Sequence, residues 1–268
     1  MPSVPTDFGA EVDFAFSGEQ APEGLQVEVL SAGDGEDVAE DAVVLADYAG
    51  HVWGEEEPFD SSFDRGAPSA FSLQSVVAGW SQGIPEHPVG SRLLISIPPE
   101  LGYGPNGGNP DAGIGAQDTI VFVVDIIDAV NPDETVADAS PTGTEDLPVI
   151  IDGDLGEPAA VSVADDAAEP VEPEALVLAE GDGASLSPGD AVVVAYSVST
   201  WNNTAQQSTW PQLDDGATGP ELAHLGQGYW QDLLIDVPVG SRVLVTLPAS
   251  ENGDPMALVA DVLLAHSQ

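Results

Sequence analysis

An internal duplication constrains the fold of this chain more than any other feature of the sequence. Four segments recur in the same order: 27–50 (VEVLSAGDGEDVAEDAVVLADYAG) as 176–198 (LVLAEGDGASLSPGDAVVVAYSV), 88–98 (PVGSRLLISIP) as 238–248 (PVGSRVLVTLP), 121–129 (VFVVDIIDA) as 257–265 (ALVADVLLA), and 8–16 (FGAEVDFAF) as 155–163 (LGEPAAVSV). The copies lie too far apart for a solenoid repeat. The pattern therefore predicts two domains of the same fold.

The composition between the repeats places the domain boundaries. Residues 1–130 form the predicted first domain, with an N-terminal extension, and 151–268 form the second. The stretch between them, 131–150, is acidic and rich in Pro, Ala and Thr, which is typical of a solvated linker. The segment DGDLGE (152–157) resembles the start of a calcium loop, but Val163 stands where such a loop needs Glu.

The charge is extreme and narrows the choice of partners. Three Arg and no Lys face 47 acidic residues, a formal net charge of −44. A protein that binds nucleic acid or anionic lipid needs cations, so neither partner is expected. Self-repulsion on this scale is relieved by high salt or by a mildly acidic medium. We therefore expect an extracellular or cell-envelope location with no signal peptide in this sequence, or the cytoplasm of a salt-adapted organism.

Cysteine is absent and the four His are scattered, so the sequence predicts no thiolate or His-based metal site and no disulfide. No apolar run is long enough to span a membrane. Segments 43–48, 92–97 and 120–127 are rich in β-branched residues and indicate strands. Segment 75–84 (SVVAGWSQGI) has helical spacing of apolar residues and Ser75 as a cap. The pattern favours an α+β fold.

Residues 41–129 resemble the FKBP family of peptidyl-prolyl cis–trans isomerases. The motifs that carry the resemblance follow in order: DAVVLADYAG, FDSSFDRG, VVAGW, PVGSRLLISIPPELGYG and TIVFVVDIIDA. The resemblance implies two FKBP-like domains, each a curved antiparallel β-sheet wrapped around one short helix. It also implies a peptidyl-prolyl isomerase that acts on proline-containing polypeptides during protein folding.

The resemblance assigns roles to named residues. It implies a shallow bowl with Trp80 as its floor. The walls are expected from Tyr48, Phe59, Val76, Val77, Ile114 and Phe122, with Phe71 contributing to substrate binding. Asp60 and the Tyr103 hydroxyl line the rim, and the Val77 N–H is expected to donate a hydrogen bond to the substrate carbonyl that follows the proline.

Two departures from the family pattern bear on ligand choice. Ser69 stands where an aromatic wall residue is usual, and loop 105–118 is rich in Gly with Ile114 as its one bulky apolar residue. We expect a wider and less apolar bowl, with reduced affinity for macrolide ligands. Isomerisation makes and breaks no bond, so no cofactor or metal is required.

The three arginines divide into two kinds. Arg92 and Arg242 occupy the same repeat position and are predicted to be structural. Arg65 has no counterpart and follows Asp60 by five residues, which favours a pair that orients this carboxylate beside the bound substrate. The alternative is a surface arginine that relieves the acidity next to Asp64.

The second copy lacks most of the predicted site. It keeps Tyr196 and Trp230, but AQQSTWPQLDDG (205–216) replaces FDSSFDRG. The offset between copies falls from 150 residues at Arg92/Arg242 to 136 at Val123/Val259, so 14 residues are missing from the intervening loop. We expect a folded domain with little or no catalysis. The alternative function for the whole chain is a non-catalytic peptide-binding chaperone or adhesion module.

Overall fold

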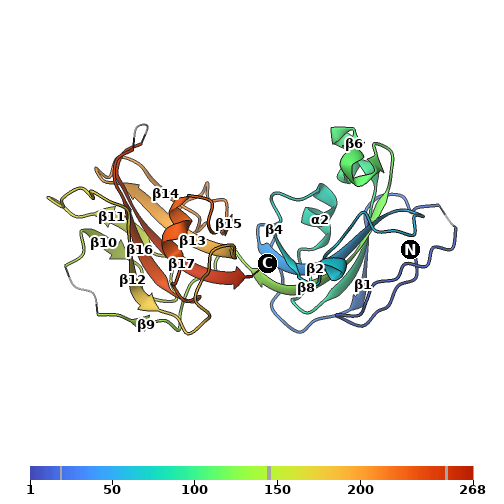
Figure 1. Ribbon diagram of the computed structural model, residues 1–268, viewed down its shortest axis with the longest axis horizontal. Helices are drawn as coiled ribbons and strands as arrows, with labels where there is room; N and C mark the ends of the chain where they lie inside the picture. Colours follow the sequence, from blue (N-terminus) through green and yellow to red (C-terminus); the bar gives the residue numbers. More distant parts are fainter. Residues whose placement is uncertain (19, 144–145, 251–252, 268) are drawn as a thin grey trace. The chain divides into compact units, whose positions relative to one another are not determined.

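The computed structural model describes residues 1–18, 20–143, 146–250 and 253–267. The chain divides into two compact units, Met1–Ala129 (unit 1) and Val130–Gln268 (unit 2), and each is considered by itself (Figure 1). Both are built mainly from strands, as the sequence predicts. Among the described residues, no helix is long and apolar enough to cross a membrane.

Unit 1 contains one sheet with the strand order β1-β5-β8-β2-β3, and β4 also pairs with β2. Its strands are β1 (Gln26–Ser31), β2 (Val43–Val52), β3 (Asp60–Ser61), β4 (Ser69–Ser72), β5 (Arg92–Ile97) and β8 (Ile120–Val130). The three predicted strands are thus confirmed, and β2 and β8 are longer than expected. Between β5 and β8 the chain leaves the sheet and forms a small hairpin, β6 (Gly108–Asn109) with β7 (Ile114–Gly115).

Two short helices and three 3-10 turns complete unit 1. They are α1 (Ser62–Arg65), α2 (Ala78–Gly83), η1 (Pro99–Leu101), η2 (Gly104–Asn106) and η3 (Pro110–Ala112). The helix predicted within 75–84 is present as α2, but the prediction that Ser75 caps it is wrong. Val77 is extended at φ −61° and ψ 146° and is the N-cap, with no side-chain cap, because Ser75 lies in a preceding turn where its N–H donates to the Ser72 carbonyl.

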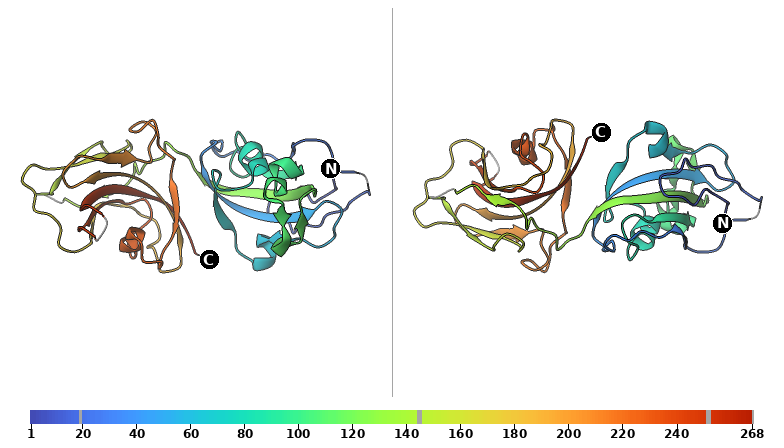
Figure 2. Two further views of the ribbon diagram at one scale, coloured as in Figure 1. Left: turned by 90° about the horizontal axis from the view of Figure 1, so that it is seen from above. Right: turned by 90° about the horizontal axis from the view of Figure 1, so that it is seen from below.

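The sheet of unit 1 is covered on both faces because its strands alternate. Phe122 and Val124 of β8 point to the side of α2, where they join Trp80 in the main core cluster. Val121 and Val123 point the other way and pack with Phe14 from the N-terminal extension. Each side chain buried in this way contributes about 1.5–3 kcal/mol. The curved strands with α2 beside them are visible in Figure 2.

Unit 2 repeats this strand order, β14-β13-β17-β16-β12-β9, with β15 also pairing with β13. Its elements are β9 (Ser140–Pro141), β10 (Val149–Asp152), β11 (Ala160–Val163), β12 (Glu174–Glu180), β13 (Ala191–Thr200), β14 (Gln206–Ser208), β15 (Glu221–His224), η4 (Trp230–Leu234), β16 (Arg242–Leu247) and β17 (Met256–His266). At the position of α2 stands the 3-10 helix η4. The described part of unit 2 contains no α-helix, and the short helix beside its sheet is of the 3-10 type.

The prediction that 131–150 is a solvated linker is wrong. Ser140–Pro141 add a strand to β12, and Val149 and Ile150 pair with β11. Val136 and Ala139 are buried against Ala179. Residues 144–145 lie outside the described part of the chain. Composition alone does not reveal this, because the buried residues are few, small and spaced among acids.

The two units share a close packing contact between a glycine and the PVGSR motif. A Cβ added to Gly33 would lie 2.1 Å from the Val89 carbonyl oxygen, and one added to Gly181 would lie 2.2 Å from that of Val239. Only glycine permits this approach. The N–H of each glycine donates to the serine of the PVGSR motif, Ser91 or Ser241, with 3.0 Å between nitrogen and oxygen in both units.

Arg92 and Arg242 are structural, as predicted. Arg92 Nε lies 2.8 Å from Asp125 Oδ1, and Arg242 Nε lies 2.7 Å from Asp261 Oδ1, with all four side chains buried. Both guanidinium groups also donate to carbonyl oxygens of the extension before the sheet: Arg92 to Asp7 and Ala10, Arg242 to Gly153, Asp154 and Glu157. The DGDLGE segment is thus held by an arginine.

Candidate functional site

A hollow of about 440 Å³ opens on the α2 side of the sheet of unit 1. Residues from five regions meet there: β2, the start of β3 with the turn before it, the segment from β4 to α2, the β5–β8 excursion, and β8. The lining residues are Tyr48, Phe59, Asp60, Phe71, Ser75, Val76, Val77, Trp80, Gly102, Tyr103, Asn106 and Phe122. Aromatic side chains predominate, with one carboxylate.

The aromatic rings pack edge to face around Trp80. Ring centroids of Tyr48, Phe71 and Phe122 lie 5.6, 5.1 and 5.3 Å from that of Trp80, with interplanar angles of 87°, 70° and 81°. Phe59 in turn meets Phe122 at 5.5 Å and 90°. Edge-to-face pairs of this kind hold rings in fixed positions. The floor of the hollow is therefore rigid and apolar.

Gly50 makes room for this arrangement. A Cβ at position 50 would lie 2.5 Å from Phe122 Cε1 and 2.7 Å from Phe59 Cζ. The glycine of the Tyr-x-Gly motif thus lets two rings press against strand β2. The sequence contains this motif, but only the packing of the two rings explains why residue 50 is glycine.

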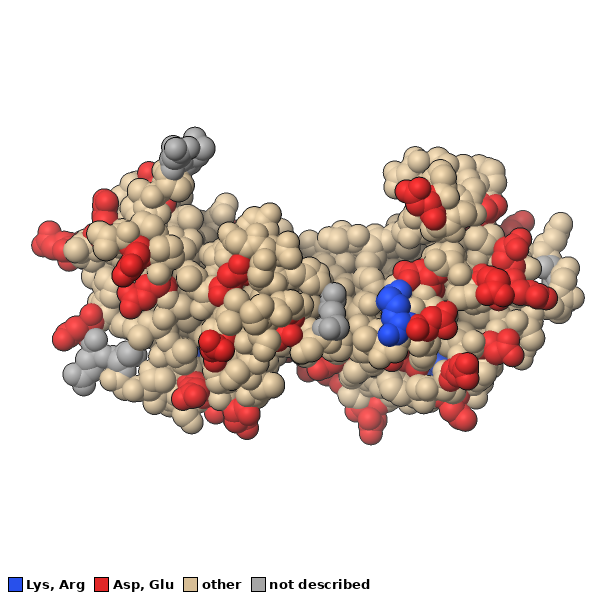
Figure 3. All heavy atoms as spheres, viewed as in Figure 1, with Lys and Arg blue, Asp and Glu red and all other residues tan. Residues whose placement is uncertain are grey.

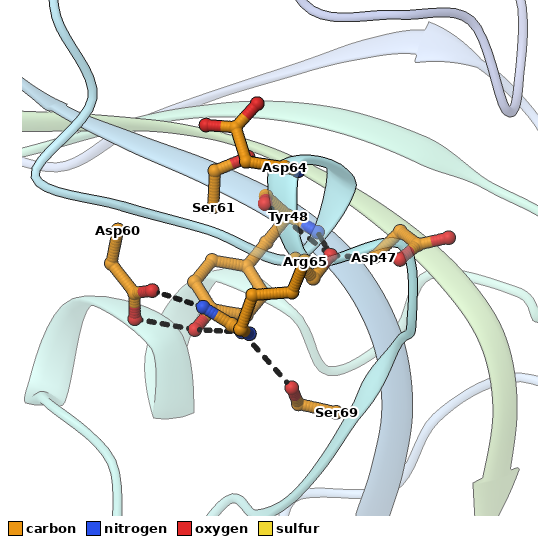
Figure 4. A network of polar contacts seen from close by, with 8 residues as sticks. Asp47, Tyr48, Asp60, Ser61, Asp64, Arg65 and Ser69 are labelled. Atoms are coloured by element: carbon orange, nitrogen blue, oxygen red, sulfur yellow. Dashed lines mark hydrogen bonds and ion pairs between the residues drawn. The ribbon is translucent and has the colours of Figure 1, made fainter. Parts of the chain in front are cut away.

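A polar network borders the hollow (Figure 4). Arg65 Nη1 pairs with Asp60 Oδ1, and the Tyr48 hydroxyl donates to Asp60 Oδ2. Arg65 Nη2 donates to the Tyr48 hydroxyl at 3.0 Å and to Ser69 Oγ at 3.2 Å. Both oxygens of the Asp60 carboxylate therefore have a partner on the protein, and the carboxylate is oriented. The predicted Arg65–Asp60 pair is present in the structure.

The two tyrosines of the site remain protonated donors across a wide pH range. Burial, followed by the hydrogen bond to Asp60, raises the pKa of Tyr48 to about 12. Burial also raises the pKa of Tyr103, with a further contribution from the charge of Asp60. Both phenols are thus able to donate hydrogen bonds at neutral pH.

The start of α2 supplies a further donor. The Val77 N–H precedes the first helical residue, and no acceptor for it is found in the part of the chain that the structure describes. Trp80 Nε1 is buried and likewise has no acceptor among the described residues. No group of three or more His, Cys, Asp or Glu side chains with metal-binding geometry occurs within residues 1–18, 20–143, 146–250 and 253–267.

The same region of the chain matches a known family. Residues 34–127 match the family model for FKBP-type peptidyl-prolyl cis-trans isomerases. A probable FK506-binding protein of Corynebacterium glutamicum is 42% identical over 110 residues, which cover 41% of this chain and 90% of that protein. The chain belongs to the FKBP-type peptidyl-prolyl cis-trans isomerase family. Residues 34–127 are therefore called the FKBP domain below.

Two further relatives place the FKBP domain among bacterial isomerases. The FK506-binding protein of Streptomyces anulatus is 34% identical over 119 residues, 44% of this chain and 94% of that protein. The isomerase FkpA of Escherichia coli is 39% identical over 118 residues, 44% of this chain. The chain spans only 42% of the length of FkpA.

Nine of the eleven predicted site residues line the hollow of the FKBP domain; they are Tyr48, Phe59, Asp60, Phe71, Val76, Val77, Trp80, Tyr103 and Phe122. Arg65 stands one contact away, bound to Asp60 and Tyr48. Ile114 is 2% exposed, packs in the core and does not line the hollow. It sits on β7, where it pairs with Asn109 of β6.

Ser75, Gly102 and Asn106 also line the hollow and were not predicted. They come from the turn before α2 and from the excursion near Tyr103. Gly102 lies within the motif PVGSRLLISIPPELGYG and Ser75 directly precedes VVAGW, but the resemblance assigned neither of them a role; Asn106 belongs to the Gly-rich loop outside the motifs. Ser69, which replaces the aromatic wall residue, instead accepts a hydrogen bond from Arg65.

Strand pairing identifies the equivalent positions in unit 2. Asp60 pairs with Gly50 and Gln207 with Val198, each two residues beyond the shared tyrosine, Tyr48 or Tyr196. Phe71 pairs with Val44, and Ala223 with Val192. Phe122 pairs with Ile95, and Leu258 with Val245. Unit 2 thus has a glutamine, an alanine and a leucine where the FKBP domain has Asp60, Phe71 and Phe122.

Proposed function

We propose that the hollow of the FKBP domain binds the proline ring of a polypeptide over Trp80 and accelerates rotation about the X–Pro bond. The observation that carries the proposal is the combination of a rigid aromatic floor with an oriented carboxylate at its edge. The family match supports an isomerase and does not favour the alternative of a non-catalytic binding module.

The chemistry follows from the nature of the barrier. Amide resonance makes the barrier to rotation about 18–20 kcal/mol. In the twisted transition state resonance is lost, and the amide is less polar than in the planar ground state. An apolar surface such as the one formed by Trp80, Phe71 and Phe122 disfavours the planar amide more than the twisted one. The free energy difference between the two states therefore falls.

Donors at the edge of the hollow orient the peptide. In this proposal the Tyr103 hydroxyl and the Val77 N–H, from two residues that line the hollow, donate to carbonyl oxygens on either side of the proline. Arg65 and Tyr48 hold the Asp60 carboxylate in one orientation, so its negative charge has a fixed position beside the substrate. No proton is transferred and no bond is broken, so positioning is the whole of the polar contribution.

Unit 2, in this proposal, is a degenerate FKBP-like domain without isomerase activity. The same strand order, the same glycine contacts and the same buried Arg–Asp pair support a common fold. The loss of the aromatic lining supports the absence of catalysis. The excursion between the paired ends Ile97 and Ile120 is also reduced to residues 248–255 in unit 2, of which 251–252 lie outside the described part.

The polypeptide clients are expected to be folding intermediates with exposed X–Pro bonds, in the extracellular space or cell envelope or in a salt-adapted cytoplasm. Acidic side chains are scattered over the face of each unit shown in Figure 3, which suits either setting. Macrolide ligands are expected to bind weakly, because the position of the usual aromatic wall residue is taken by Ser69, which binds Arg65 instead.

The test is a proline tetrapeptide isomerisation assay on the full chain. We expect Asp60→Ala to lower kcat/KM by about tenfold or more, because the oriented charge at the edge of the hollow is lost. Gln207→Ala changes the equivalent position in unit 2 and serves as the matched control, with no effect expected. An inactive wild-type chain, or equal losses in the two variants, would refute the proposal.

A further inference from the structure

Unit 2 has a hollow of its own, of about 660 Å³, beside Trp230. Its lining includes Glu221, Ala223 and His224 of β15 and Gln227, Tyr229 and Trp230 from the following segment. The Tyr196 and Trp230 rings keep the geometry of the Tyr48–Trp80 pair, with centroids 5.3 Å apart at 75°. The hollow of unit 2 therefore retains part of an aromatic floor while its other walls have changed.

The main change is the position of the carboxylate that lines the hollow. Glu221 pairs with Val194 in the ladder, the position that corresponds to Ser69, which pairs with Ala46 in unit 1. The Tyr196 hydroxyl donates to Glu221 Oε2 at 2.8 Å, and Gln231 Nε2 donates to Glu221 Oε1 at 2.6 Å. Each oxygen holds one donor and keeps a further lone pair. The carboxylate is half-buried and fixed, with acceptor capacity to spare.

The segment that carries Tyr229 is also held in place. The Asp232 carboxylate accepts from the Gly226 N–H at 2.6 Å and from the Gly228 N–H at 2.7 Å. Tyr229 follows Gly228 in the chain and is 72% exposed. Among the described residues, the other aromatic side chains are buried more deeply. An oriented carboxylate therefore lines the same hollow as one half-buried and one exposed aromatic ring.

From these contacts we propose that the hollow of unit 2 binds the guanidinium group of an arginine side chain in a basic polypeptide. A planar guanidinium pairs with a carboxylate and stacks on aromatic faces at the same time, which an ammonium does less well. A proline ring would be disfavoured here, because it would cover a carboxylate without pairing it. The charge of the chain, −44, attracts basic segments toward both units.

The probe is a short blocked peptide with one arginine, titrated into the full chain by calorimetry at about 0.15 M salt to screen diffuse attraction. The control peptide replaces arginine by citrulline, which has nearly the same shape and no charge. We expect saturable binding of one arginine peptide per chain, and at least about tenfold weaker binding of the citrulline peptide.

Glu221→Gln should weaken binding of the arginine peptide about tenfold or more, because it removes the charge while keeping the size of the side chain. Tyr229→Ala should weaken it about fivefold, and this exposed residue can be changed without disturbing the core. Glu169→Gln is the matched control. It removes one exposed charge two residues after Ala167. Ala167 packs on the opposite face of the sheet from Trp230, so this variant should leave binding unchanged.

Equal binding of the two peptides, or an undiminished affinity in Glu221→Gln, would overturn the proposal and leave only diffuse attraction to an acidic surface. The isomerase activity of each variant is measured in parallel and should equal that of the wild type. This readout separates the site in unit 2 from the one proposed in the FKBP domain, since either proposal can fail while the other holds.

Discussion

In unit 1 the Phe71 and Phe122 rings pack against Trp80, whereas unit 2 has Ala223 and Leu258 at the matching strand positions. The contacts that stabilise the sheet within each unit, the glycine contacts and the buried Arg–Asp pair, are nearly the same in the two units. The side chains that line the hollow beside Trp80 or Trp230 differ between the units. A fold of this kind is thus maintained by a few buried residues far from the site, so its walls can change without loss of the sheet.

The tyrosine shared by the two units makes the difference concrete. Tyr48 donates to a carboxylate on β3 and accepts from Arg65, while Tyr196 donates to a carboxylate on β15. In unit 1 the carboxylate that lines the hollow is paired with an arginine, and in unit 2 its partners among the described residues are Tyr196 and Gln231 only. The carboxylate that binds the tyrosine thus comes from β3 in unit 1 and from β15 in unit 2. We expect this difference to alter which ligand binds beside the same Tyr–Trp pair.

The sharpest test of the comparison is to separate the units. We expect residues 1–129 to retain the isomerase activity of the chain and residues 130–268 to show at least about a thousandfold less, a difference of about 4 kcal/mol in transition-state stabilisation. A proline tetrapeptide assay on each purified unit measures this. Comparable rates from the two units would break the distinction drawn between them.

The buried arginines test where the units are alike. Arg92→Ala and Arg242→Ala should each lower the free energy of unfolding of their own unit by roughly 3 kcal/mol, because each leaves a buried aspartate unpaired. Denaturant unfolding of each unit, followed by tryptophan fluorescence, gives the values. A large loss in one unit and none in the other would show that the shared Arg–Asp pair does not have a shared role.

Gly50 tests where the units differ. Gly50→Ala should displace the Phe59 and Phe122 rings, at a cost of about 1–3 kcal/mol in stability, and lower kcat/KM about tenfold. The equivalent residue in unit 2 is already a valine, Val198, and Val198→Ala should leave the isomerase rate of the full chain unchanged. Full activity in Gly50→Ala would mean that the tight ring packing is not needed for catalysis.

Arg65 and Asp60 are expected to act as one unit. Arg65→Ala should lower kcat/KM severalfold to about tenfold, with a melting temperature close to that of the wild type, since both side chains are about half exposed. The double variant with Asp60→Ala should be little worse than Asp60→Ala alone. Additive losses in the assay would show that the two residues contribute separately.

The smallest expected effect concerns the shared tyrosines at alkaline pH. Burial raises the pKa of Tyr48 from 10.0 to about 12, and Arg65 limits the rise; burial and Glu221 raise the pKa of Tyr196 with no nearby cation. Arg65→Ala should therefore raise the pKa of Tyr48 further, toward that of Tyr196, as measured by phenolate absorbance. A lower value in the variant would contradict the assigned network.

The same shifts predict how stability depends on pH. Because the folded pKa of Tyr48 lies above its unfolded value of 10.0, the unfolded chain releases this proton first as the pH rises. The stability contribution is complete below pH 10.0 and is lost as the pH rises toward about 12. Thermal melts across this range check the sign, with Tyr48→Phe expected to reduce the fall.

The sequence by itself determined the duplication, the strands at 43–48, 92–97 and 120–127, the structural role of Arg92 and Arg242, and most of the residues that line the hollow. These features depend on local patterns: β-branched runs between turns, a repeated motif, and side chains that follow one another closely along the chain. Such patterns leave a direct trace in the order of the residues.

Only the tertiary structure decided that residues 131–150 belong to unit 2, that Ile114 faces the core, that α2 begins at Ala78, and that Glu221 meets Tyr196. Each of these depends on a contact between residues far apart in sequence, or on which side of a short strand a residue faces. Such a contact is set by the packing of whole elements, because a shift of one residue along a strand reverses the direction of every side chain.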